Sequence, residues 1–394
     1  MRRIFLLKNN SKSCIIKIAT RKEHTAMTTL LDYLVWRGDL SFSQDPFNEV
    51  DNLILAELCY FDFGDVIAKG ETVTLENAAR RYLKLYPRGT HKLGLMMTPA
   101  FDDFLILTAQ TKRFSEIKLS FPVNIIKKRP AMQFAAITYE LPTKDLYVAF
   151  RGTDDHIVAW KESLSLAVKD EIPAHKAAVA YLNAVLQKRS ENMYVGGHSK
   201  GGNLAMYAAL KIDPSDRCRI LKIYNNDGPG FRRDQSENEA FLAMKDKLHW
   251  TTPYLSVVGA MLEHGENAEV IESSGKGLLL QHDAFTWRVR GNAFVRLPAR
   301  SEESRKLENA VKAWTEKLGE KEQKHFIDTL YHLLTSSGAE TLSEIGEEKI
   351  KSAYKATATL FTLKKETRDL VAHALLLFFR ERRNAIRAEK AKKD

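Results

Sequence analysis

A serine flanked by glycines, at the junction of an apolar run and a helical run, constrains the fold of this chain most strongly. Residues 192–199 (NMYVGGHS) have the pattern of a buried strand, and residues 200–211 (KGGNLAMYAALK) have that of a helix. Gly197, Ser199 and Gly201 match G-x-S-x-G at this junction. A sharp strand-to-helix turn brings the helix close to the strand, so its flanking residues need very small side chains. The pattern therefore predicts that Ser199 Oγ projects above a sheet, at the positive end of a helix.

The serine lies in a region, from about residue 130 to residue 297, where β-rich and helical runs alternate. Strands are expected at residues 134–141, 145–152, 192–199, 219–227, 247–253, 268–273 and 284–297. Helices are expected at residues 174–189, 200–211 and about 233–247. The first two strands flank a short Pro142–Lys144 turn and should form a hairpin. This alternation is typical of an α/β fold with a mostly parallel sheet that is covered on both faces.

Helical patterns flank the alternating region on both sides. Residues 27–125 are expected to form helices and turns, with helices at Thr74–Pro87 and Ala100–Phe114. From Ala299 onward we see no strand pattern. Four helices are expected there, at residues 301–318, 320–335, 341–363 and 365–393.

These patterns predict the domain organisation. An α/β domain is expected at residues 27–298, with its core at about 130–298 and an N-terminal helical segment before that core. A C-terminal helical module is expected at residues 299–394. Residues 1–26 show no periodicity and are interpreted as a disordered extension, or as a stretch that precedes a translation start at Met27.

The formal net charge of +10 is concentrated at the two ends of the 394-residue chain. Residues 1–26 and 380–394 account for all of it, and residues 27–379 are formally neutral. A basic nucleic-acid-binding domain is therefore not expected, and both ends are interpreted as solvated tails. The alternatives are weak electrostatic contact of the basic ends with an anionic membrane or with nucleic acid.

Cysteine usage and hydropathy argue against a disulfide-rich, metal-binding, secreted or membrane-spanning protein. The three cysteines, Cys14, Cys59 and Cys218, lie far apart, and no CxxC or Cys/His pair has metal-ligand spacing. We therefore expect no disulfide framework, no metal site and a reducing, cytoplasmic location. The apolar stretch at Ile4–Leu7 is too short for a secretory signal, and no run of about 18 apolar residues could span a bilayer.

A second motif precedes the serine. The apolar strand at residues 145–152 ends in Phe150–Thr153 (FRGT). A hydroxyl and a free main-chain N–H of Thr153 could face Ser199 across the top of the sheet and stabilise an oxyanion. The main-chain N–H of Lys200, at the start of the helix, is the other expected donor. The alternative is a simple capped turn, because Gly-Thr-Asp-Asp is also good turn chemistry.

Together the two motifs resemble the class 3 (fungal-type) lipases over about residues 145–230. The shared features are Phe150–Thr153, a tryptophan at position 160, the helix at 174–189 and Gly197–Gly202. The chain is similar over about residues 27–380 to a bacterial lipase-like family that opens with a segment like Leu30–Phe42. The resemblance implies an α/β-hydrolase fold, Ser199 as nucleophile, and Thr153 with the Lys200 N–H as oxyanion hole. It implies neither a metal nor an organic cofactor.

The base and the acid of a triad should follow Ser199 in the order acid, then histidine. His282 lies in a loop between two late strands and is the expected base, with His264 as the alternative. Asp227 closes the strand at 219–226, where catalytic groups gather in open α/β sheets, and is the expected acid. Class 3 lipases place their acid after the next strand, so Glu263 and Asp283 remain alternatives, as does the absence of an acid.

The expected function is that of a serine hydrolase of carboxylic esters, such as small esters or acyl lipids, working through an acyl-enzyme. The alternative is an inactive hydrolase-fold protein that binds a partner through its helical module. The Lys200 ammonium departs from the apolar residue commoner in lipases; it could attract an anion, but we expect it to reach solvent. The cluster Leu375–Phe379 is expected to be helix-bundle core, with a dimer, lid or lipid contact as alternatives. The sequence leaves a homo-oligomer open.

Overall fold

The computed structural model describes residues 28–88, 101–256, 258–259, 261–263 and 268–347, with residues 355, 359, 362–369, 371–373, 376 and 380. The predicted extension at 1–26 lies outside the described residues. So do most of the predicted last helix and most of the Leu375–Phe379 cluster. No helix in the described part of the chain is long and apolar enough to cross a membrane.

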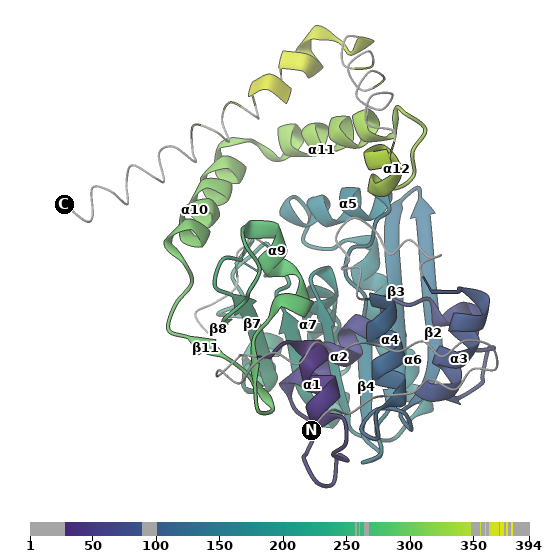
Figure 1. Ribbon diagram of the computed structural model, residues 1–394. Coiled ribbons are helices and arrows are strands. Elements are labelled where there is room, and N and C mark those ends of the chain that lie inside the picture. Colours follow the sequence, from purple (N-terminus) through teal and green to yellow (C-terminus); the bar gives the residue numbers. More distant parts are fainter. Residues whose placement is uncertain are drawn as a thin grey trace.

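Nine strands of the described residues form one sheet in the order β1-β2-β3-β4-β5-β6-β7-β8-β11 (Figure 1). Their bounds are β1 Val73–Thr74, β2 Lys118–Lys128, β3 Ala131–Glu140, β4 Leu146–Phe150, β5 Met193–His198, β6 Ile220–Asn226, β7 Leu248–Pro253, β8 Glu269–Ile271 and β11 Arg296–Leu297. Strands β4 to β8 run parallel, and the remaining pairs are antiparallel. The predicted α/β fold with a parallel core is confirmed.

Helices cover both faces of this sheet. One face packs against α1 (Leu30–Arg37), α2 (Glu49–Leu58), α3 (Leu75–Leu85) and α4 (Phe101–Gln110), which lie in front of the sheet in Figure 1. The other face packs against α6 (Pro173–Lys188), α7 (Lys200–Lys211) and α8 (Glu239–Met244).

Alternation along the strands serves both cores. In β4, Tyr147 and Ala149 belong to the core beneath α1–α4, whereas Val148 and Phe150 belong to the core beneath α6 and α7. Successive side chains of a strand point to opposite faces, so a strand that is covered twice is apolar throughout.

The central elements follow the sequence predictions. Helices α3, α4, α6 and α7 and the β3–β4 hairpin lie where they are expected. Helix α3 begins after Thr74, whose side chain accepts from the N–H of Asn77.

Two predictions at the edges of the sheet are wrong. Residues 27–125 are not only helices and turns, because β2 begins at Lys118, so the sheet starts before residue 130. A bulge between Ser120 and Val123, which includes Pro122, interrupts the alternation of β2 and hides the strand pattern. Residues 284–297 form a short turn, a hairpin of β9 (Val289–Arg290) and β10 (Ala293–Phe294), and β11 instead of one strand.

The C-terminal helices lie above one end of the sheet (Figure 1). They are α10 (Glu302–Lys317), α11 (Glu320–Thr335) and α12 (Leu342–Glu347), and α11 packs on α5 (Ile157–Leu164). Their own apolar cluster is small: Leu318 is buried against Trp314 and Phe326. The domain boundaries at residues 26 and 298 stay predictions.

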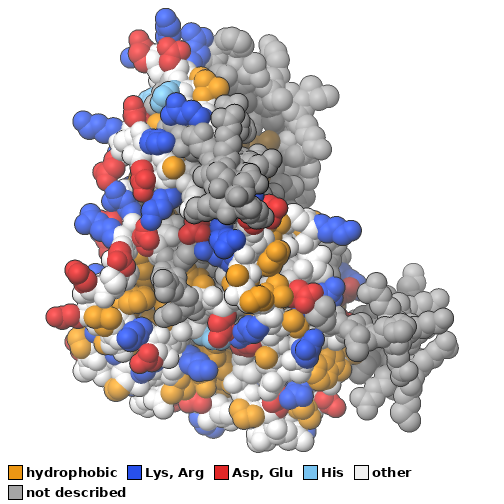
Figure 2. Space-filling view, turned by 90° about the vertical axis from the view of Figure 1, so that its left-hand side faces the viewer, with side chains coloured by type: hydrophobic (Ala, Val, Ile, Leu, Met, Phe, Trp, Pro, Cys, Tyr) orange, Lys and Arg blue, Asp and Glu red, His pale blue; other side chains and the backbone are white. Residues whose placement is uncertain are grey.

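The surface carries charges of both signs. On the face drawn in Figure 2, Lys and Arg side chains alternate with Asp and Glu side chains between apolar patches. This mixture is consistent with the formal neutrality of residues 27–379.

Candidate active site

Ser199 occupies the turn between β5 and α7 in a strained backbone conformation. Its φ is 58° and its ψ is −133°, a region that residues with side chains rarely adopt. The Ser199 N–H donates to the carbonyl oxygen of Asn226 on the neighbouring strand, at 2.9 Å. A Cβ at Gly201 would collide with the carbonyl group of Phe150, so the helix can approach β4 only without a side chain there. The predicted sharp turn is present, and Ser199 is buried, with 9% of its surface exposed.

Asp227 and His282 meet at the carboxyl end of the parallel strands, the end at which Ser199 also lies. His282, the last residue of α9 (Leu278–His282), places Nδ1 2.6 Å from Asp227 Oδ2. Asp227 directly follows β6 and is fully buried. Its other oxygen, Oδ1, accepts from Thr252 Oγ1 at 3.0 Å, Ser256 Oγ at 2.5 Å and the Gly259 N–H at 3.1 Å. A proton on Nδ1 toward the carboxylate leaves Nε2 of His282 as the ring's acceptor.

Two main-chain N–H groups next to the turn have no acceptor within the described part of the chain. Among the described residues, neither the N–H of Lys200 nor that of Thr153 has a hydrogen-bond acceptor. Lys200 is the first residue of α7, where the helix leaves its N–H groups unpaired. Such donors at a helix N-terminus favour a negative charge.

A family model described as Mbeg1-like matches residues 108–332, more than half of the chain. The chain belongs to the Mbeg1-like family. This is a lipase-like α/β-hydrolase family. The match covers β2 to β11 and includes Thr153, Ser199, Asp227 and His282. A comparison with curated proteins finds no match.

The other two carboxylates that the sequence suggested make other contacts in this Mbeg1-like chain. The Glu263 side chain is partly exposed and pairs with Lys312 Nζ at 2.8 Å. Asp283 accepts from the N–H of Phe285 at 3.0 Å, and burial raises the pKa of its carboxyl group to about 6. His264, the alternative base, lies outside the described residues. Of the three carboxylates considered, Asp227 is the one in hydrogen-bond contact with His282.

The hydroxyl of Thr153 is already engaged. Its Oγ1 lies 2.6 Å from Ser163 Oγ, and Ser163 Oγ donates to the carbonyl oxygen of Ala159 at 2.9 Å. A hydroxyl has one proton, so Ser163 must accept from Thr153. The free donor of Thr153 is therefore its main-chain N–H, not its hydroxyl.

The expectation that the Lys200 ammonium reaches solvent is wrong. The side chain is buried and donates to the carbonyl oxygen of Gln133 at 2.8 Å, to Gln133 Oε1 at 2.7 Å and to Glu162 Oε2 at 3.0 Å. Burial lowers the pKa of Lys200, and the charge of Glu162 opposes this shift. The partners come from β3 and α5, which the sequence around Lys200 does not reveal.

A second buried pair beside the turn is absent from the sequence predictions. His198 Nδ1 lies 2.9 Å from Glu57 Oε1 of α2, and His198 Nε2 donates to the carbonyl oxygen of His282 at 3.0 Å. Burial disfavours the imidazolium of His198, but the charge of Glu57 raises its pKa overall. The pair therefore fixes the backbone of the residue that would act as base. No local pattern singles out Glu57 among the acidic residues of its helix.

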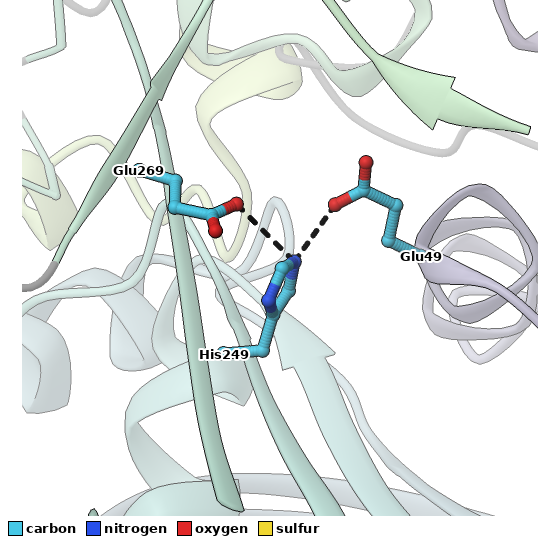
Figure 3. A group of neighbouring side chains, drawn as sticks. All are labelled: Glu49, His249 and Glu269. Atoms are coloured by element: carbon cyan, nitrogen blue, oxygen red, sulfur yellow. Dashed lines mark hydrogen bonds and ion pairs between the residues drawn. The ribbon is translucent and has the colours of Figure 1, made fainter. Parts of the chain in front are cut away.

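Glu49, His249 and Glu269 converge at the opposite end of the strands, with ligand atoms within 4.8 Å of one another (Figure 3). His249 Nε2 lies 2.8 Å from Glu49 Oε2 and 3.7 Å from Glu269 Oε2. These three residue types could hold a metal ion. However, the Arg296 guanidinium pairs with both carboxylates, at 2.6 Å from Glu49 Oε2, and so supplies the cation. The arrangement favours an internal ion-pair cluster.

Proposed function

We propose that this Mbeg1-like protein is a serine hydrolase of carboxylic esters, with small esters or acyl lipids as substrates. The observation that carries the proposal is the 2.6 Å contact between buried Asp227 and His282. Asp227 follows the carboxyl end of β6, and the glycine-flanked Ser199 follows the carboxyl end of the neighbouring β5. The resemblance of the FRGT and GHSKGG motifs to class 3 lipases supports the same reaction.

In the proposed mechanism, His282 Nε2 takes the proton of Ser199 as Oγ attacks the ester carbonyl carbon. Asp227 stabilises the imidazolium that forms. The N–H groups of Lys200 and Thr153 donate to the oxyanion of the tetrahedral intermediate. The alkoxide leaves with the proton from His282, and water, activated by the same imidazole, releases the acid from the acyl-enzyme.

The alternative of an inactive interaction protein is motivated by the several candidates for the acid that the sequence offers. The Asp227 carboxylate accepts hydrogen bonds on both oxygens and contacts His282, and this supports the hypothesis of an active enzyme. The cytoplasmic location and the weak membrane contact of the basic ends stay predictions. A homo-oligomer likewise remains open.

The test compares hydrolysis of p-nitrophenyl esters by D227N and D283N. We expect D227N to lose about 10³–10⁴ in kcat, because the imidazole loses its anionic partner. D283N is the matched control, since it removes the neighbouring carboxylate and should keep kcat within about threefold of wild type. Equal activity of D227N and wild type, or no difference between wild type and S199A, would contradict the proposal.

A further inference from the structure

The Lys200 side chain belongs to a buried group that the proposed mechanism does not use. We name Lys200, Glu162 and Gln133 the Lys200 cluster; each is at most 1% exposed. The three donors of the ammonium meet three acceptors, at 2.7 to 3.0 Å. Burying an ion pair costs desolvation and is weak evidence for stability by itself. Lys200 directly follows Ser199, and this position indicates a role in the candidate site instead of in stability.

Glu162 extends the cluster to further elements. Its Oε2 also accepts from the N–H of Gln133 at 3.0 Å, and its Oε1 accepts from the N–H of Ala174 at 2.9 Å. One carboxylate thus joins β3, α5, the first turn of α6 and the first turn of α7.

The same stretch of α5 also holds the other side of the site. Ser163, next to Glu162, accepts the hydroxyl proton of Thr153. Consecutive residues of α5 therefore hold Lys200 and Thr153, the two residues whose free N–H groups flank the Ser199 turn. The preceding residue, Lys161, pairs with Asp328 of α11 at 2.8 Å, which links this part of α5 to the C-terminal helices.

We propose that the Lys200 cluster positions the oxyanion hole: it fixes α5 against the first turn of α7, so that the N–H groups of Thr153 and Lys200 point at one oxygen. This inference rests on the proposed function and adds positioning residues to it. Oxyanion donors act through preorganisation at about 2.7–3.1 Å from the developing charge. Small losses of alignment should therefore lower kcat more than they weaken substrate binding.

The test exploits the fact that both proposed donors are main-chain groups. K200M removes the ammonium but keeps the N–H of residue 200, so a loss of kcat would report position and not a deleted donor. We expect K200M to lower kcat for p-nitrophenyl esters by about 10–100-fold with KM changed less than about threefold. E162Q keeps the shape of the side chain and should show a smaller loss of kcat of the same kind. It still tests the Lys200 cluster if K200M does not fold.

Two further variants separate positioning from stability. K200M/E162Q removes both buried charges and should regain thermal stability relative to K200M without regaining kcat. R296M breaks the pair with Glu49 at the far end of the strands, and should lower the melting temperature but leave kcat unchanged.

The outcomes are distinguishable. A kcat of wild-type size in K200M and E162Q, with only the melting temperature lowered, would overturn the positioning role while S199A remains inactive. If wild type and S199A do not differ, the proposed function fails and the inference falls with it.

Discussion

At the residue scale, two of the proposed catalytic residues have a strained backbone conformation. Ser199 has a φ of 58° and Asp227 has a φ of 50°, both in the left-handed region. Such a conformation costs about 1–3 kcal/mol for a residue with a side chain and persists only where the surroundings enforce it. Here the enforcement is main-chain pairing: the N–H of Ser199 donates to Asn226 and the N–H of Asp227 donates to Thr251. Each neighbouring strand thus fixes one of these turns.

Acid sensitivity is expected from Glu49 in the cluster with His249 and Arg296. Burial opposes ionisation of Glu49, but hydrogen bonds from His249 and Arg296 lower its pKa from 4.5 to about 2. A depressed pKa of the folded state means that the stabilisation, about 3 kcal/mol, is present above pH 4.5 and is lost as the pH falls toward 2. Urea unfolding between pH 6 and pH 3 should therefore show the free energy of unfolding of wild type approaching that of E49Q. A difference between the two proteins that does not depend on pH would contradict this assignment.

Sequence reasoning reaches the residues of the candidate site where a local rule applies. Glycine flanks point to Ser199, a strand end points to Asp227, and a loop between late strands points to His282. It fails for Glu57, Glu162 and Gln133, because their roles come from contacts with residues far away in the chain. An acid on a helix has the same local pattern whether it faces water or a buried histidine.

At the scale of elements, the junction of β4, β5 and α7 depends on the absence of side chains. A Cβ at Gly201 would meet the Phe150 carbonyl group, and one at Gly197 would meet the backbone of Gly201. These are backbone contacts, so no flexible side chain can move aside.

Substitution G201A is therefore expected to destabilise the fold by about 2–3 kcal/mol or more, because α7 must shift away from β4. Gly319 supplies the control. Its φ is an ordinary −55°, and a Cβ there would have one neighbour, Glu322 Oε2, at 3.8 Å. G319A should stay within about 1 kcal/mol of wild type. Denaturant midpoints measure both variants, and equal stability of G201A and G319A would refute the close-approach argument.

Elements with strong periodicity or clear caps could be predicted from the sequence, and irregular ones could not. Helix α7 follows an apolar strand directly after the glycine-flanked Ser199, so it is expected within its observed bounds. Strand β2 has a bulge beside Pro122 and many exposed positions, and therefore resembles neither a buried strand nor a helix. Strand β8 lies within the strand expected at 268–273, whereas β11 has two residues and is too short to produce a pattern of its own.

At the scale of the whole molecule, apolar burial is uneven. Two large cores lie on the faces of the sheet, whereas the described C-terminal helices contribute a cluster around Leu318. These helices attach to the sheet domain by polar contacts such as the N–H of Ile157 to the carbonyl oxygen of Glu340, at 2.9 Å, and Lys161 with Asp328. Local opening should therefore start there.

Hydrogen exchange followed by mass spectrometry should show this order. We expect amides of α10 and α11 to exchange at least about tenfold faster than those of β4, β5 and β6, whose exchange requires global unfolding. Equal protection of both regions would mean that the C-terminal helices are part of the cooperative core.

The central claim is that Ser199 is a nucleophile activated by His282, and covalent labelling tests it most directly. A fluorophosphonate probe should react with the folded wild-type protein, with Ser199 Oγ displacing fluoride from phosphorus, and peptide mass spectrometry should locate one adduct on Ser199. S199A should not react, and D227N should react much more slowly. A folded wild-type protein that acquires no adduct, or acquires it on another residue, would contradict the account.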